Sequence, residues 1–180
     1  GGPKGVGGLI LRDGVDLPAL GLGGGQEMGR RAGTENISGI AGMGAAADAA
    51  MRDLADGLWD GVAEVRNILE SALEAGANGS IVAGRNEMRL PNTTCLVTRG
   101  WKGETQVMQM DLAGFAVSAG SACSSGKVRP SRVLKAMGFD DDAAASAIRV
   151  SIGPGVGREE VLRFADTWLA AERRHRARAA

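Results

Sequence analysis

A long helical repeat is the feature that most restricts how this chain of 180 residues can fold. Between Ile40 and Leu73, apolar residues recur at spacings of three and four, which places them on one face of an α-helix. Gly57 and Gly61 interrupt this pattern and are expected to break or bend the helix. Shorter helical and extended patterns alternate along the rest of the chain, which indicates an α/β or α+β unit.

Short apolar segments predict the strands. Residues 6–11 are apolar and follow directly on a turn, so they predict a buried strand. A brief strand is expected at residues 115–117, and a longer one at residues 147–152. Helical patterns cover residues 103–112 and the stretch from residue 159 to about residue 172.

The last of these strands carries an arginine. With the two-residue period of a strand, Arg149 shares a face with Ala147 and Ser151, while the isoleucine and valine side chains share the other face. Two interpretations stay open from this pattern. Arg149 is either a solvent-facing strand residue, or a planar guanidinium that binds a carboxylate through two hydrogen bonds.

Cys123 lies in a run of small residues that extends from Val117 to Gly126. A structural thiol usually packs among large apolar side chains, whereas Ser, Ala and Gly offer little surface to hold it in a core. The run therefore favours a nucleophilic thiol on a mobile loop, and a loop cysteine without a role is the alternative. His175 lies in a charged tail and is not expected to be its base, and Cys95 lies in a strand pattern that predicts a core thiol.

The polar segment from Gly23 to Asn36 is rich in glycine and contains two arginines, with Thr34 just ahead of the long helix. Such a loop suits a bound phosphate or carboxylate. An ordinary loop, in which Thr34 or Asn36 caps the helix, explains the same residues. The segment does not fit the dinucleotide fingerprint.

Composition excludes several classes of function. The 21 basic and 21 acidic residues balance, which argues against binding to nucleic acid or to an anionic membrane. No apolar run is long enough to span a bilayer. Two cysteines and one histidine are too few for a disulfide scaffold or a metal site, so no metal is expected. No signal peptide is visible, and the expected location is the cytoplasm.

Five segments together resemble the C-terminal half of class I cysteine desulfurases, which belong to the class V aminotransferases. Enzymes of this kind use pyridoxal phosphate and supply sulfur for iron–sulfur clusters and other thiocofactors. The segments follow the family's order and cover nearly the whole chain: Gly2–Gly7, Gly23–Asn36, Arg89–Thr93, Ser118–Ser125 and Ile148–Gly153.

The resemblance implies a role for three residues. Cys123 would take sulfur from the substrate L-cysteine, which leaves alanine and a persulfide on the enzyme. Arg149 would hold the substrate carboxylate, and Thr34 would reach the cofactor phosphate of the partner subunit in a homodimer. The sulfur would pass to an acceptor protein, such as a cluster scaffold or a sulfur relay protein.

The resemblance also implies a fold. The chain would be the C-terminal part of a fold type I transferase, with residues 1–45 completing the large domain and residues 46–180 forming a small α+β domain. The family's cofactor-binding lysine would precede Gly1, so the chain alone is predicted to be inactive. The family often has a basic residue where this chain has Met28. A selenocysteine lyase, another class V enzyme and a non-catalytic persulfide carrier remain alternatives.

Overall fold

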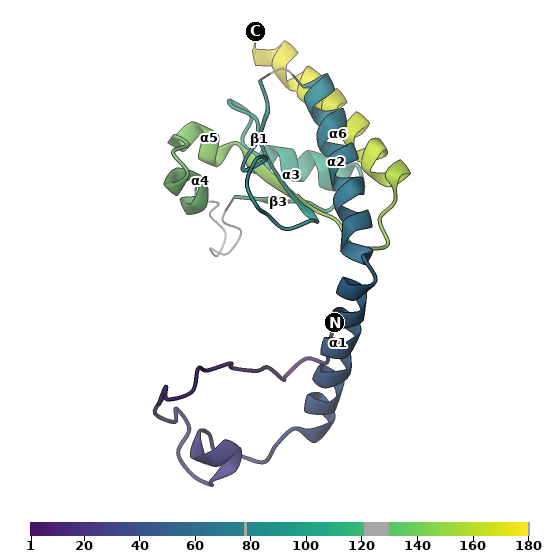
Figure 1. Cartoon of the computed structure of the whole chain (residues 1–180). Helices are drawn as coiled ribbons and strands as arrows, with labels where there is room; N and C mark the ends of the chain where they lie inside the picture. The colour runs from purple at the N-terminus through teal and green to yellow at the C-terminus, as the bar shows by residue number, and fades with distance from the viewer. Residues whose placement is uncertain (78, 121–129, 180) are drawn as a thin grey trace. The chain divides into compact units, whose positions relative to one another are not determined.

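The computed structural model describes residues 1–77, 79–120 and 130–179 (Figure 1). The chain divides into two compact units, residues 1–56 and residues 57–180, and each is described by itself. The sequence-based division into residues 1–45 and 46–180 stays a prediction. No helix within the described ranges is both long and apolar enough to cross a membrane.

The first unit combines an irregular segment, a glycine-rich loop and helix α1 (Ile37–Ala55). A single short 3-10 turn, η1 (Gln26–Gly29), interrupts the loop. The strand expected at residues 6–11 is not formed, and Ile10 is almost fully exposed. That prediction was wrong because an isolated strand is unstable, and none of residues 1–56 forms a strand that could pair with it.

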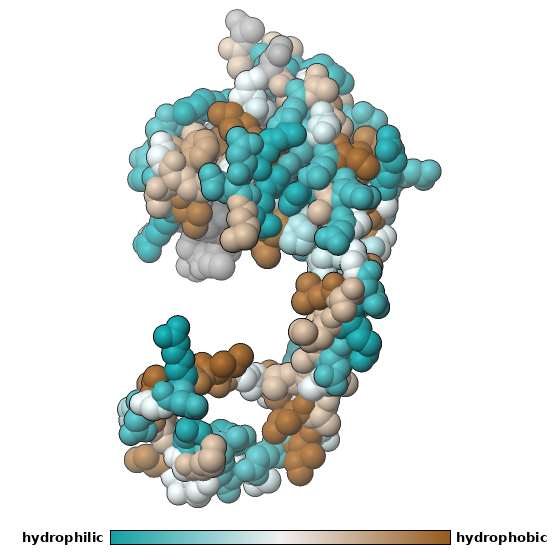
Figure 2. All heavy atoms as spheres, viewed as in Figure 1, coloured by the Kyte–Doolittle hydropathy of each residue, from teal (hydrophilic) through white to brown (hydrophobic). Residues whose placement is uncertain are grey.

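Large apolar side chains are exposed throughout this unit (Figure 2). Folded monomers rarely leave so many such groups in water, and contiguous apolar surface of this kind is usually covered by another polypeptide. The most exposed of them are Leu9, Ile10, Leu20, Leu22, Met28, Ile37, Met51 and Leu54.

The helical repeat is broken at one of the two expected glycines. Helix α1 ends at Ala55, and α2 (Leu58–Gly76) begins directly after Gly57. Gly57 has a φ of 73°, in the left-handed region where glycine has no steric penalty. Gly61 lies inside α2 and does not interrupt it, so that part of the expectation was wrong.

The second unit is built on a four-stranded antiparallel sheet with the order β1-β2-β4-β3. Its strands are β1 (Ile81–Val82), β2 (Thr93–Val97), β3 (Ser118–Ala119) and β4 (Ala147–Ser151). The strand predicted at residues 115–117 was misplaced, because β3 forms only at the residues that can pair with β4.

The two faces of this sheet are covered differently (Figure 1). Helices α2 and α6 (Arg158–Ala179) pack on one face, with help from α3 (Gly103–Leu112), and bury the larger apolar core. The short helices α4 (Arg132–Ala136) and α5 (Asp141–Ala145) cover part of the other face through a smaller core of mostly small side chains. The second face therefore keeps an uncovered region.

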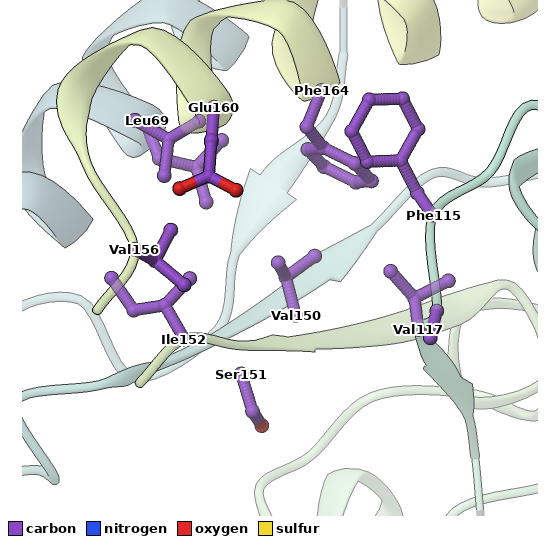
Figure 3. A pocket seen from close by; sticks show the side chains of 11 residues that line it. Leu69, Phe115, Val117, Val150, Ser151, Ile152, Val156, Glu160 and Phe164 are labelled. Atoms are coloured by element: carbon purple, nitrogen blue, oxygen red, sulfur yellow. The ribbon is translucent and has the colours of Figure 1, made fainter. Parts of the chain in front are cut away.

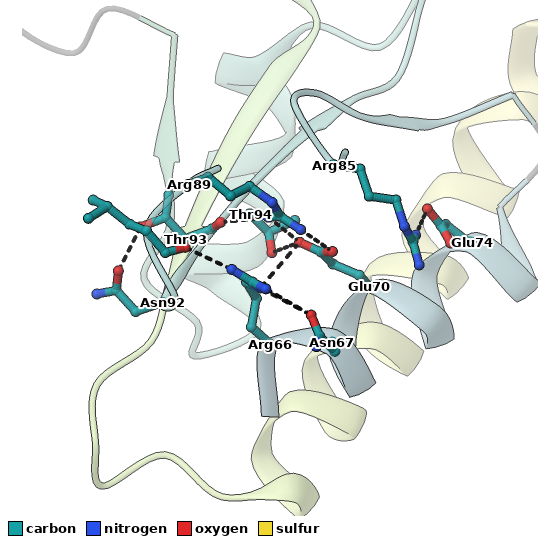
Figure 4. Close-up of polar contacts among 10 residues, drawn as sticks. Arg66, Asn67, Glu70, Glu74, Arg85, Arg89, Asn92, Thr93 and Thr94 are labelled. Atoms are coloured by element: carbon teal, nitrogen blue, oxygen red, sulfur yellow. Dashed lines mark hydrogen bonds and ion pairs between the residues drawn. The ribbon is translucent and has the colours of Figure 1, made fainter. Parts of the chain in front are cut away.

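A buried carboxylate connects α2 to the sheet (Figure 4). Arg89 donates to both carboxylate oxygens of Glu70, at 2.7 and 2.6 Å, and the Thr94 hydroxyl donates to one of them at 2.7 Å. Arg66 lies 4.0 Å from the same carboxylate. Burial alone would raise the pKa of Glu70, but these hydrogen bonds and charges hold it below its usual value.

A second polar group lies inside the larger core. The Gln106 side chain donates to the carbonyl oxygens of Trp101 and Ser146, at 2.7 and 3.2 Å. Its own oxygen accepts a hydrogen bond of 3.1 Å from the indole N–H of Trp168. This fully buried amide therefore links α3 and α6 to the backbone of Trp101 and of Ser146, the residue just before β4.

Candidate functional site

Arg149 lies on an inner strand of the sheet, on the face that is only partly covered. Its neighbours across the strands are Cys95 on β2 and Ser118 on β3. Directly paired residues of antiparallel strands point to the same face, so the three side chains form one row. Arg149 is exposed, whereas Ile148 and Val150 are buried on the opposite face. The alternation inferred from the sequence is thus confirmed.

An open pocket of about 350 Å³ lies at this row. Arg149 and Cys95 line it, and α4 closes it from the side through Arg132 and neighbouring apolar side chains. Gly120, directly before residues 121–129, and Ser131, two positions after them, also line it. Described residues from both sides of the segment that carries the predicted nucleophile therefore line the same pocket as Arg149. Cys123 itself lies outside the described residues.

No carboxylate within the described parts of the chain lies at ion-pair distance from Arg149. Segment 121–129 contains no acidic residue either. A guanidinium without an internal partner, in a pocket, is suited to bind an external carboxylate through two parallel hydrogen bonds.

Cys95 has a position that its strand pattern did not indicate. Its side chain is half-buried against the smaller core, as expected of a core thiol, but it also lines the pocket. Burial raises the pKa of the Cys95 thiol, and the charge of Arg149 partly opposes that effect. Sequence analysis missed this arrangement, and it also missed Arg132. Only the register of β2 against β4 places the thiol opposite Arg149.

Thr34 lies in the first unit, at a mainly polar hollow of about 320 Å³ that Arg31 and Glu27 also line. Asn36 caps α1 by accepting a hydrogen bond of 3.0 Å from the Gly39 amide. Of the two candidates for the helix cap, Asn36 is therefore the one that caps α1. Thr34 is exposed, and its hydroxyl has no hydrogen-bond partner among the residues described.

The donors around this hollow fit an anion such as phosphate. The Arg31 guanidinium donates to the Gly33 carbonyl at 2.7 Å and contacts the Glu27 carboxylate at 3.3 Å. The guanidinium thereby offsets the one acidic group in the hollow, and the Thr34 hydroxyl and exposed loop backbone remain available. Thr34 and Arg149 lie in different units, each in a pocket of its own.

A third pocket, of about 140 Å³, lies on the opposite face of β4 (Figure 3). Apolar side chains such as Val150, Ile152 and Phe164 line it, and the Glu160 carboxylate lies at its edge. Glu160 accepts a hydrogen bond of 3.1 Å from the Gly157 amide, so it serves the start of α6. Of the residues that line this pocket, none is a cation, a cysteine or a histidine, so the pocket offers no partner for a substrate carboxylate.

The family pattern described as Aminotransferase class-V matches residues 1–164. The chain belongs to the class V aminotransferases. A cysteine desulfurase from Cereibacter sphaeroides is 44% identical over 163 residues, which are 91% of this chain and 41% of that protein. One from Klebsiella pneumoniae is 43% identical over 160 residues, 89% of this chain and 40% of that protein.

The solved structure of a NifS-like protein matches this class V chain with a TM-score of 0.80 and 33% identity. The match covers 94% of this chain and 43% of that one. The fold type I assignment is therefore confirmed. This class V chain spans about two fifths of the length of the cysteine desulfurases that it matches.

Proposed function

We propose that this chain is the C-terminal part of a pyridoxal-phosphate-dependent cysteine desulfurase. The enzyme converts L-cysteine to L-alanine and supplies sulfur for iron–sulfur cluster or thiocofactor assembly. The observation that carries the proposal is the pocket in which Arg149, without an internal carboxylate partner, meets both flanks of the Cys123 segment. The relatives named above, which are called cysteine desulfurases, support the same reaction.

Arg149 holds the carboxylate of the substrate. Pairing with two neighbouring strands fixes the backbone of Arg149, and its planar guanidinium can present two parallel N–H groups to a carboxylate. Hydrogen bonds to charged groups contribute about 1.5–3 kcal/mol each, which is enough to orient an amino acid in the pocket.

Cys123 accepts the sulfur. Its thiolate forms an S–S bond with the substrate sulfur while the C–S bond of the substrate breaks, and the product is a persulfide on the enzyme. Pyridoxal phosphate, when bound, supplies the electron sink for the pair left on carbon. Thr34 would donate to the phosphate group of the cofactor bound in the partner subunit, which agrees with the exposed hydroxyl that lines its hollow.

A homodimer and an acceptor protein belong to the same proposal. The exposed apolar side chains of residues 1–56 are suited to burial against the rest of the large domain or against a second subunit. The cytoplasmic location stays a prediction. The 180-residue chain alone is predicted to release no sulfide from L-cysteine when pyridoxal phosphate is added.

The test uses the full-length enzyme that contains this chain. Arg149→Lys keeps the charge but removes the second parallel hydrogen bond, so the KM for L-cysteine should rise roughly 10- to 100-fold. Cys123→Ser should abolish alanine formation from L-cysteine. An unchanged KM in the Arg149 variant would refute the carboxylate role. Continued activity of the Cys123 variant would favour the selenocysteine lyase.

A further inference from the structure

We propose that a polar hollow between α3 and the end of α6 binds a small phosphate anion, which Arg174 and Arg178 hold from two successive turns of α6. The hollow has a volume of about 340 Å³. None of the described residues lines both this hollow and the pocket at Arg149, so the inference goes beyond the proposed function and does not depend on it. Neither the desulfurase assignment nor the motifs of the sequence give the two arginines a role.

Every ionisable side chain that the described chain contributes to this hollow is basic. Helix α6 contributes Arg174 and Arg178, together with the ring of His175, and α3 contributes the amide of Gln109. No acidic residue within the described ranges lines the hollow. Guanidinium groups bind phosphate oxygens through paired N–H donors, and an amide adds a neutral donor. The chemistry of the lining therefore favours an oxyanion.

Helix α6 gives the two arginines no acidic partner. Side chains three and four positions apart are neighbours on a helix, and the positions before Arg174 at these spacings are both alanine, whereas those before Arg178 are His175 and Arg174. Arg176, by contrast, follows Glu172 by four positions and pairs with it at 2.6 Å. Among the residues that the structure describes, no ion pair involves Arg174 or Arg178. Like charges four positions apart destabilise a helix, and a bound anion would offset that cost.

The C-terminal end of α3 lies at the same hollow, and free carbonyl oxygens at a helix end would repel an anion. Most of these oxygens already accept hydrogen bonds. The amides of residues 113–115 donate to the carbonyl oxygens of Gln109, Met110 and Asp111, at distances from 2.8 to 3.2 Å. The carboxylate of Asp111 does not line the hollow. The end of α3 therefore leaves the hollow open to a negative charge.

His175 connects the hollow to a tryptophan. Its ring stacks on the ring of Trp101, with the two centroids 5.3 Å apart and an angle of 16° between the planes. Its Nε2 atom lies 3.2 Å from the carbonyl oxygen of Gly100, which can only accept, so Nε2 carries the proton of this hydrogen bond. An anion in contact with His175 should therefore change the emission of Trp101, which is fully buried.

The test titrates the full-length enzyme that contains this chain with inorganic pyrophosphate at constant ionic strength. Binding is measured by calorimetry and by tryptophan emission. Arg174→Gln and Arg178→Gln should each raise the dissociation constant about three- to tenfold, because each removes one charge-assisted contact at an exposed site. Arg173→Gln is the matched control, because it removes the same charge from the same part of α6 and does not line the hollow. It should change the dissociation constant by less than about twofold.

Three results would overturn the inference. The first is that pyrophosphate shows no saturable binding. The second is that Arg174→Gln and Arg178→Gln both bind it as the wild type does, which would place the anion elsewhere on the enzyme. The third is that Arg173→Gln weakens binding as much as they do, which would show attraction to the net charge of the helix alone. None of these results bears on the proposed function, because the residues changed do not line the pocket at Arg149. Circular dichroism checks that each variant is folded.

Discussion

The pair formed by Glu70 and Arg89 gives the sharpest test of how the second unit is held together. Replacing Arg89 by Met keeps a long side chain but leaves a buried carboxylate with Thr94 and the more distant Arg66 as its partners. Breaking a buried ion pair on one side costs about 3–5 kcal/mol. Because the Arg89 side chain is 17% exposed and Thr94 still donates, we expect a loss of about 2–3 kcal/mol.

Arg85→Met is the matched control. Arg85 pairs with Glu74, which lies one helical turn after Glu70 on α2, but these two side chains are 41% and 38% exposed. Exposed ion pairs contribute about 0–1 kcal/mol, so the control should lose no more than that. Urea unfolding followed by tryptophan fluorescence reports on the correct unit, because Trp59, Trp101 and Trp168 all lie in residues 57–180.

The destabilisation caused by Arg89→Met should become smaller as the pH falls. The pKa of Glu70 is lowered in the folded state. The stabilisation by the ion pair is therefore fully present above the unfolded-state pKa of about 4.3, and it is lost as the pH falls through the folded-state pKa. Without Arg89, burial dominates and raises the pKa of Glu70. The difference in unfolding free energy between wild type and Arg89→Met should therefore be larger at pH 7 than at pH 4.

A Glu70→Gln/Arg89→Met cycle isolates the interaction, with an expected coupling of about 1–3 kcal/mol. The reasoning fails if Arg89→Met and the Arg85→Met control destabilise the protein equally. It also fails if the destabilisation by Arg89→Met grows as the pH is lowered from 7 to 4.

Three further predictions use the same chain. Gly57→Ala should lower the unfolding free energy by about 1 kcal/mol, because Gly57 has a positive φ. Gly61→Ala should raise it by roughly 0.5–1 kcal/mol, because Gly61 lies inside α2 with open space for the methyl group. Urea titrations in which both variants change the unfolding free energy in the same direction would contradict this. Gln106→Leu should lower the unfolding free energy by about 1–3 kcal/mol, because a buried indole N–H loses its acceptor, and a loss below that range would show that the indole finds another partner. Burial raises the pKa of Cys95, so its alkylation midpoint should lie above the free-thiol value of about 8.5 and rise further in Arg149→Gln; a lower midpoint in either protein would disprove the assigned cause.

Local patterns predicted the regular elements of the second unit well. The expected helix over residues 103–112 matches α3 at both ends, and the expected strand over residues 147–152 matches β4 to within one residue. Both patterns arise from residues that are close together in the sequence, and packing against the core did not override them. The predicted strand over residues 6–11 failed because a strand depends on a partner that its own residues cannot provide.

The candidate site was predictable in part. The alternation within β4 was sufficient to place Arg149 on the face opposite the main core. The nucleophilic role of Cys123, inferred from the small residues around it, stays a prediction. Neither observation identified the residues that lie next to Arg149 in the folded structure. Cys95 lies 54 positions earlier and Arg132 lies on a separate short helix, and no local pattern connects them to β4.

The amino-acid sequence by itself determined where the chain becomes helical or extended, which side of each element is apolar, and which family its motifs resemble. These properties depend on residues within a few positions of each other, whose spacing sets the face on which each side chain lies. The tertiary structure alone decided that Glu70 is neutralised by Arg89, and that a thiol and a second guanidinium share the pocket of Arg149. Strand register and helix packing bring distant residues together, and burial then decides which charges need a partner.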